Sequence, residues 1–192
     1  MRGPVGLGTP CRVAMLVLLA GLAVNTTAWG QAAGPFDTFT VTPCRVLDTR
    51  VASGLPLLSP PGPSGTVGGP LAPIPAGGYL PIIVNGDLTA GGTVHQGGMP
   101  NCNVPDNAMG AFVNVVAVNA GGAGWLTVYP SNTNLPNAST LNFSTGQTVA
   151  NGILVPVCTP ANSCLKDLNI NMGPFAGAHV VVDITGYLMP TQ

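Results

Sequence analysis

Apolar and polar residues alternate along most of the chain beyond residue 35, with the two-residue period that is typical of β-strands. Clusters of Gly, Pro and Asn separate these runs, and no segment has the period of a convincing amphipathic helix. The pattern predicts an all-β fold, a β-sandwich or a jelly-roll-like domain with long Pro/Gly-rich loops. The strands that it predicts span residues 36–41, 44–50, 79–84, 111–119, 125–129, 139–143, 149–157, 168–172 and 179–187.

Some of these runs allow finer predictions. Pro43 ends the first run, which is typical of a short edge strand. Residues 111–119 are apolar on both faces, which predicts a central strand covered on both sides. The Gly-rich turn that follows predicts that 125–129 is its hairpin partner. In the last run, alternation places Asp183 on the face opposite to the aliphatic residues around it.

The first 30 residues have the three parts of a secretory signal peptide. Arg2 and Arg12 precede an apolar run, residues 13–24, and small residues follow it. We expect cleavage after Gly30 or Ala32, so that the mature protein is secreted and lies outside the cell or at its surface.

The mature chain is expected to form one domain with an N-terminal extension. Residues 31–42 predict an edge strand or a strand exchanged between copies, and residues 43–192 predict a single all-β domain. Within that domain, residues 51–78 are rich in Pro, Gly and Ser, which indicates a long surface loop.

Charged residues make up only 6% of the chain, against about 25% in an average globular protein. Beyond the signal peptide three basic residues remain, Arg45, Arg50 and Lys166, against six aspartates and no glutamate. So few cations exclude nucleic acid as a partner and argue against anionic lipid. No later apolar run approaches the roughly 20 residues of a transmembrane helix, so we expect no membrane insertion after cleavage.

Four cysteines follow the signal peptide, and an even number in an exported chain predicts two disulfides with three alternative pairings. The favoured pairing joins Cys158 to Cys164 across a short turn and Cys44 to Cys102 across a long loop. Zinc is the alternative, but these cysteines include no close Cys-x-x-Cys pair and have no suitably spaced His. We expect no metal and no cofactor.

Four of the nine charged residues of the mature chain, Arg45, Asp48, Arg50 and Asp183, lie in its two most motif-like segments. They predict either a polar site for a sugar or, as the favoured interpretation, a structural ion-pair network between the first and last strands. We do not expect an enzyme, because suitably spaced carboxylates and a Gly-x-Ser-x-Gly nucleophile turn are both missing from the sequence.

Three aromatic residues, Trp125, Tyr129 and Tyr187, are candidates for a platform that stacks against sugar rings. Aromatic residues at alternate strand positions are more often part of a core, and that alternative stays open.

Three segments stand out as motifs, namely PCRVLDTR at 43–50, WLTVYP at 125–130 with STLNF at 139–143, and HVVVDITGY at 179–187. They resemble, in the same order, the RvlDTR, GyltvyP with S-x-lN, and hvvvDv-x-GYf signatures of a family of secreted bacterial all-β domains. The resemblance implies an extracellular accessory module, found alone or beside secreted hydrolases such as cell-wall amidases, without an established activity. The cysteines and the long Pro/Gly loop depart from that pattern.

Two functions of different classes follow. The first is a non-catalytic structural protein that associates with copies of itself into a surface layer or filament, because a surface with little charge lacks the repulsion that keeps proteins apart. Phe36, Phe39 and Val41 would lie in the strand exchanged between copies. The alternative is a monomeric module that binds glycans, such as a cell-surface polysaccharide, or that acts as a cell-wall accessory module.

Overall fold

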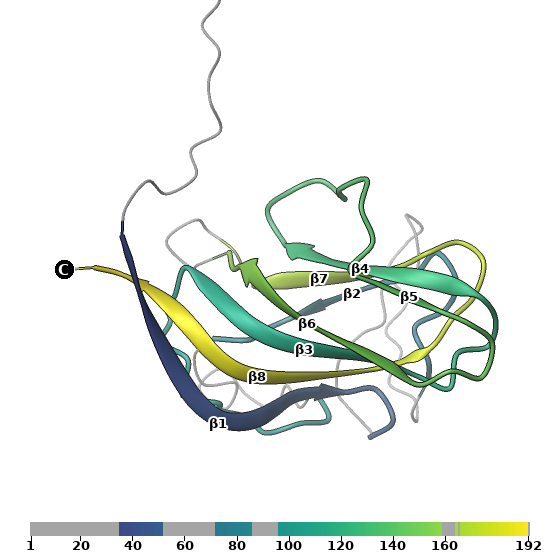
Figure 1. Ribbon diagram of the computed structural model, residues 1–192, viewed down its shortest axis with the longest axis horizontal. Helices are drawn as coiled ribbons and strands as arrows, with labels where there is room; N and C mark the ends of the chain where they lie inside the picture. Colours follow the sequence, from purple (N-terminus) through teal and green to yellow (C-terminus); the bar gives the residue numbers. More distant parts are fainter. Residues whose placement is uncertain (1–34, 52–71, 86–95, 159–163, 165, 192) are drawn as a thin grey trace, which may run out of the picture. The chain divides into compact units, whose positions relative to one another are not determined.

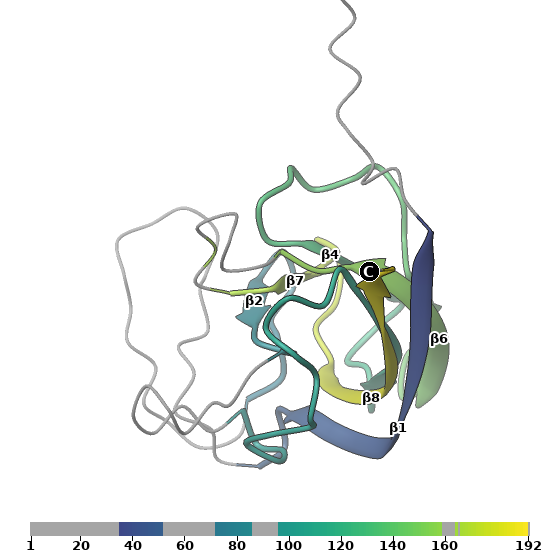
Figure 2. The ribbon, with the colours of Figure 1, turned by 90° about the vertical axis from the view of Figure 1, so that its left-hand side faces the viewer.

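The computed structural model describes residues 35–51, 72–85, 96–158, 164 and 166–191. These residues form two packed β-sheets, which Figures 1 and 2 show as two layers, so the predicted sandwich-like all-β fold is confirmed. The predictions for the signal peptide and for most of the 51–78 loop fall outside the described residues. The strands are β1 (Phe36–Asp48), β2 (Tyr79–Ile82), β3 (Gly110–Val118), β4 (Gly124–Pro130), β5 (Leu141–Phe143), β6 (Val149–Pro156), β7 (Leu168–Met172) and β8 (His179–Pro190).

Each sheet has four strands, and every pair of neighbouring strands is antiparallel. Sheet A has the order β1-β8-β3-β6, and sheet B has the order β2-β7-β4-β5. The first and last strands of the chain are therefore neighbours in sheet A, and β1 and β6 are its two edges. Within the described residues there is no helix that is long and apolar enough to cross a bilayer.

The core lies between the sheets and follows directly from the alternation of the sequence. Val113 and Val115 of β3, Leu126 of β4 and Ile170 of β7 point inward and are almost wholly buried. Full burial of such a side chain contributes about 1.5–3 kcal/mol, so these inward positions supply most of the driving force for folding.

The predicted hairpin between 111–119 and 125–129 is wrong, because β3 and β4 belong to different sheets. The Gly-rich turn carries the chain from sheet A to sheet B, and both sides of β3 pair with β8 and β6 instead. β3 is central as predicted, but it is not covered on both sides, since Phe112 and Asn114 on its outer face are half-buried. Alternation identifies a strand and its faces but not its partner.

Pro43 does not end the first strand, because the predicted strand 36–41 and most of the predicted strand 44–50 form the single strand β1, which ends at Asp48. The register against β8 shifts between Thr40 and Cys44 and again between Arg45 and Leu47. Such irregularities, together with the edge position, accommodate a proline that has no N–H to donate.

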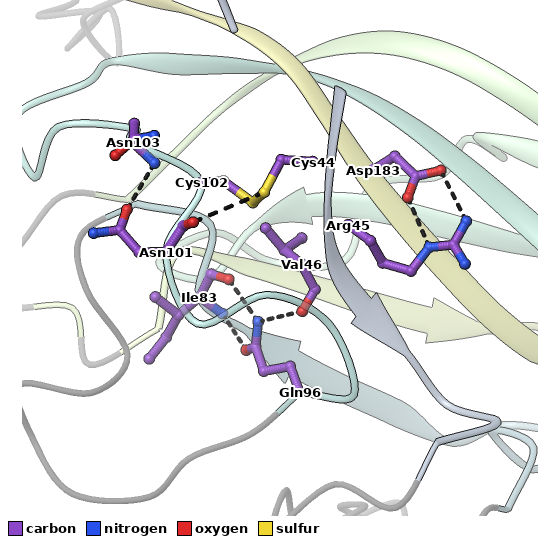
Figure 3. Close-up of a disulfide and its surroundings, with 9 residues drawn as sticks. All are labelled: Cys44, Arg45, Val46, Ile83, Gln96, Asn101, Cys102, Asn103 and Asp183. Carbon is purple, nitrogen blue, oxygen red and sulfur yellow. Dashed lines mark hydrogen bonds and ion pairs between the residues drawn. A yellow bond between two sulfur atoms is a disulfide. The ribbon is translucent and has the colours of Figure 1, made fainter. Parts of the chain in front are cut away.

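The side chain of Gln96, which is 1% exposed, links the two sheets (Figure 3). Its Nε2 donates to Val46 O of β1 at 3.2 Å and to Ile83 O, just beyond β2, at 2.7 Å, while its Oε1 accepts from Ile83 N–H at 2.7 Å. Because this buried amide forms hydrogen bonds to both sheets, it fixes the position of one sheet relative to the other.

Candidate functional site

Sheet A has two open edges. The segment 96–99 covers the C-terminal half of β1, where Asp48 N–H donates to Gln96 O at 2.9 Å and Met99 N–H to Arg45 O at 2.6 Å. Residues 36–42 have no such cover on their outer side among the described residues, and neither has β6. We call the free side of 36–42 the β1 edge and the free side of β6 the β6 edge.

The β1 edge contains the residues predicted to take part in strand exchange. The structure pairs this strand with β8 of the same chain, and Phe39 stacks on Tyr187 with ring centroids 5.2 Å apart. Phe36 and Phe39 are 36% and 43% exposed, while Val41 packs partly against the core. The strand therefore completes its own sheet and still leaves aromatic surface at the edge.

The β6 edge is uninterrupted. All eight residues from Val149 to Pro156 carry no charge, and they pair with β3 without a register shift from Gly110 to Ala117. Leu154 is 49% exposed. Edge strands usually carry lysine, proline, bulges or inward charges that prevent another strand from adding to them, and of these β6 has only a proline, Pro156, at its end.

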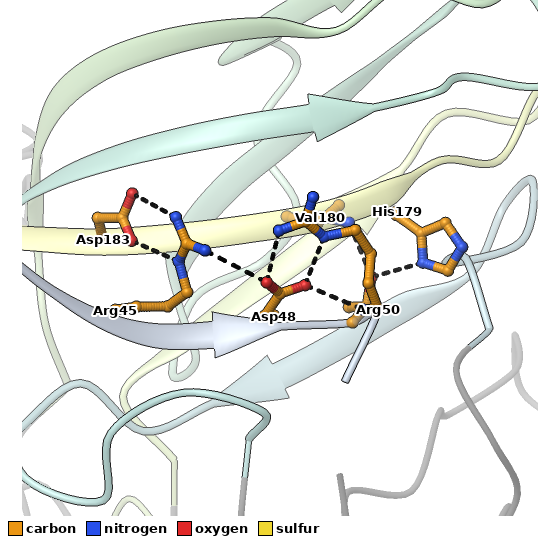
Figure 4. A network of polar contacts seen from close by, with 7 residues as sticks. Arg45, Asp48, Arg50, His179, Val180 and Asp183 are labelled. Carbon is orange, nitrogen blue, oxygen red and sulfur yellow. Dashed lines mark hydrogen bonds and ion pairs between the residues drawn. The ribbon is translucent and has the colours of Figure 1, made fainter. Parts of the chain in front are cut away.

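The four charged residues predicted as a network come together on the outer face of sheet A, where β1 lies beside β8 (Figure 4). Arg45 Nε donates to Asp183 Oδ1 at 2.8 Å, and Arg45 Nη1 lies 3.3 Å from Asp48 Oδ2. Arg50 binds the same carboxylate twice, from Nη2 to Oδ2 at 2.6 Å and from Nε to Oδ1 at 2.8 Å. The chain's own guanidinium groups occupy the carboxylates, which supports the structural interpretation rather than a sugar site.

Asp48 is the centre of this network and is only 3% exposed. Its pKa lies below the ordinary value, chiefly because of the hydrogen bonds from the Arg50 side chain. The next residue, Thr49, accepts from Val180 N–H at 2.9 Å and lies 3.1 Å from His179 Nδ1. The Asp-Thr-Arg segment thus fastens the end of β1 to the start of β8.

Both disulfides have the favoured pairing, which confirms that prediction. Cys44 and Cys102 are separated by 58 positions and join β1 to the segment before β3 (Figure 3). Cys158 and Cys164 close a loop with a separation of 6 between β6 and β7. Two disulfides are consistent with an oxidising extracellular environment.

The predicted aromatic platform does not form as a unit, because Trp125 and Tyr129 lie on β4 of sheet B whereas Tyr187 lies on β8 of sheet A. Tyr129 is 9% exposed and hydrogen-bonds with Asn169, and burial raises its pKa. Trp125 alone remains half-buried at the surface of sheet B. Tyr79 of β2 lies near Tyr129 and was missed by the sequence analysis. Its alternation with the buried Leu80 already placed it on the outer face.

A groove beside Trp125 follows the outer face of sheet B. Strands β4, β5 and β7 form its floor and the loop after β4 forms its wall, and its volume is about 350 Å³. Its lining residues share one property, the absence of any charge, and they are Trp125, Thr127, Leu135, Pro136, Asn137, Ala138, Ser139, Asn142 and Asn171.

The described residues contain no group of three or more His, Cys, Asp or Glu side chains that could hold a metal ion. One of the chain's two histidines, His95, lies outside those residues. His179 is engaged with Thr49, and Asp183 with Arg45.

Asp167 is a buried polar residue that sequence reasoning missed. It is 3% exposed, and its Oδ2 accepts from Val84 N–H at 2.6 Å and Asn85 N–H at 3.0 Å. Its pKa is raised, chiefly by burial. The only sign of this role in the sequence is that a single aspartate precedes an apolar run. Such a position does not distinguish a buried hydrogen-bond acceptor from a solvent-exposed residue.

No family model, no curated protein and no solved structure matches this chain. The motif resemblance to a family of secreted bacterial domains therefore stays a prediction.

Proposed function

We propose that this protein is a non-catalytic extracellular structural subunit that associates head to tail into a filament or surface layer through the two edges of sheet A. The observation that carries the proposal is the β6 edge, eight uncharged residues without a bulge and with Leu154 half exposed. An open, regular strand of this kind is a template for the strand of another molecule.

The topology of sheet A favours head-to-tail contacts. Because its four strands alternate in direction, β1 and β6 run antiparallel to each other. A second copy in the same orientation would then place its β1 edge antiparallel to the β6 edge of the first. Contacts between two different surfaces repeat without closing unless the rotation forms a ring, so they generate extended assemblies.

Edge addition requires no opening of the fold. Residues 36–40 already pair with β8 of their own chain, so the predicted strand exchange would first have to break those pairs. The low charge supports association further, since the β1 edge carries Asp37 alone and the β6 edge carries no charge.

The test places one lysine at each edge, as Leu154→Lys and Thr38→Lys, with Asn132→Lys in an exposed loop as the matched charge control. We expect large ordered assemblies of the mature protein and of the control by electron microscopy and light scattering. Each edge variant should stay monomeric, because a lysine on an edge opposes addition of another strand.

Mixing the two edge variants separates head-to-tail contacts from two-fold ones. Each variant retains one free edge, so an equimolar mixture should form one-to-one dimers and nothing larger. If Thr38→Lys dimerises alone, the contact joins two β6 edges and the head-to-tail arrangement is wrong. A wild-type protein that stays monomeric, or assemblies that both lysines leave intact, would refute the proposal itself.

A further inference from the structure

The groove on the outer face of sheet B lies on a different sheet from the two assembly edges. Its floor combines aromatic and amide side chains through the strand pairing, since Trp125 of β4 stands opposite Asn142 of β5 and Thr127 stands opposite Asn171 of β7. Because paired residues on antiparallel strands share a face, these four side chains form one continuous surface.

Trp125 is held in place from below and from the side. A Cβ at Gly173 would lie 2.7 Å from the indole ring, so the absence of a side chain there allows the ring to lie against the backbone. Phe175, which is 74% exposed, meets Trp125 edge-on with ring centroids 5.4 Å apart. The indole is therefore a fixed and partly open wall of the groove.

The amides of the groove are available for a ligand. Asn137, Asn142 and Asn171 form no side-chain hydrogen bond among the described residues, whereas Thr127 donates to Ala138 O at 2.7 Å and Tyr129 is occupied by Asn169. Each free amide offers two donors and one acceptor oxygen, so one side chain can pair with neighbouring hydroxyl groups.

We propose that this groove binds a neutral carbohydrate chain. A sugar ring has an apolar C–H face that packs on an indole and an edge of hydroxyl groups that pairs with amides, and this groove contains both kinds of side chain. No charged residue lines it, so nothing compensates a uronate or a phosphate. Its volume of about 350 Å³ is at the lower end of the roughly 300–1,000 Å³ of small-molecule sites, which suits one or two sugar units.

None of the groove residues lies on β1 or β6, so we expect binding that does not require self-association, although Asn151 of β6 donates to Thr140 O beside the groove at 2.8 Å. The experiment therefore uses the mature protein that carries Leu154→Lys, alongside the wild type. The probes are linear hexasaccharides of glucose, mannose and N-acetylglucosamine, with a galacturonate hexasaccharide as the charged comparison and an uncharged hexapeptide as the competing ligand class.

We expect saturable binding of at least one neutral hexasaccharide by calorimetry, with a shift of the Trp125 indole N–H resonance. Trp125→Ala should weaken binding about tenfold or more, since buried aromatic anchors dominate such contacts. Asn142→Ala, an exposed position, should weaken it by about two- to tenfold through a lost hydrogen bond. Asn132→Ala, an exposed amide of the neighbouring loop outside the groove lining, should leave affinity unchanged.

Absence of binding to all three neutral probes by a folded protein would overturn the inference. So would affinity that survives both Trp125→Ala and Asn142→Ala, or a preference for the peptide or the galacturonate. Because Asn142→Ala changes an exposed side chain, its effect separates loss of the site from loss of the fold.

Discussion

Two places in the domain each combine a disulfide with a buried aspartate, and they hold the two carboxylates in opposite ways. Near Cys44–Cys102, Asp48 faces two guanidinium groups and its pKa is lowered. Near Cys158–Cys164, Asp167 receives two backbone N–H groups and its pKa is raised. Both side chains are 3% exposed, but burial is the chief influence on the pKa of Asp167, whereas the hydrogen bonds from Arg50 outweigh burial at Asp48.

The two aspartates have different partners because they connect different parts of the fold. Asp48 binds two half-exposed arginines at the end of β1, and one of them, Arg45, reaches Asp183 of the last strand across the outer face of sheet A. Asp167 ties β7 to the segment after β2 inside sheet B, and its backbone oxygen also accepts from Cys158 N–H at 3.1 Å. Asp48 is held by ion pairs. Asp167 is held by hydrogen bonds from uncharged backbone groups, which leave its negative charge buried.

The disulfides should show the largest contrast between the two places. Replacing both cysteines of the long bridge, Cys44→Ser with Cys102→Ser, should lower the free energy of unfolding by about 4 kcal/mol, because the bridge closes a large loop in the unfolded chain. Cys158→Ser with Cys164→Ser should cost about 2 kcal/mol. Urea unfolding of both double variants measures this, and equal losses would contradict the loop-length explanation.

Asp48→Asn comes next and should lower the free energy of unfolding by about 2 kcal/mol at neutral pH, since Arg45 and Arg50 lose a charged acceptor but stay half solvated. Because its folded-state pKa is lowered, Asp48 stabilises the fold above the unfolded-state pKa of about 3.9, and this contribution is lost as pH falls through the folded-state pKa. The loss caused by the variant should therefore shrink in acid.

Asp37→Asn is the control for that experiment, because it removes an exposed carboxylate from the same strand and should change stability by less than about 0.5 kcal/mol. A similar effect of both variants would mean that net charge, rather than the Asp48 network, determines the result.

Asp167→Asn should have a smaller effect than Asp48→Asn, and with the opposite sign. An amide oxygen still accepts from Val84 and Asn85, and the buried charge is gone, so we expect a gain of about 1 kcal/mol at pH 7. Because the folded-state pKa is raised, the contribution of the acid is present below about pH 4 and is lost as pH rises through the folded-state pKa. Thermal unfolding from pH 3 to pH 7 should show the advantage of the variant growing with pH, and a loss at pH 7 would contradict the cost assigned to the charge.

Much of the fold could be predicted because alternation is local. The inward faces of β3 and β8 and the outward position of Asp183 follow from a period of two. The favoured cysteine pairing was also accessible, since four cysteines allow only three pairings. The β1 bulges were not, because the sequence shows Pro43 as a break and only the pairing with β8 shows how the strand continues past it.

The sites divide in the same way. Arg45 and Asp183 could be predicted as partners, since few other charges exist to compensate them. The aromatic platform could not, because Tyr187 and Trp125 fit the same local pattern although they lie on different sheets. Gln96 and Asp167 were missed because a single polar residue does not reveal whether backbone donors will surround it.

By itself the sequence determined the all-β class, the faces of the strands and the scarcity of charge, because each depends on residue type or on neighbours along the chain. It favoured one of the three cysteine pairings without deciding among them. The tertiary structure alone decided which strands share a sheet, where sheet A ends in open edges, what lies beside Trp125, and why two aspartates with little exposure have opposite pKa shifts. These features depend on contacts between residues far apart in the chain, and such contacts leave no periodic trace in a single sequence.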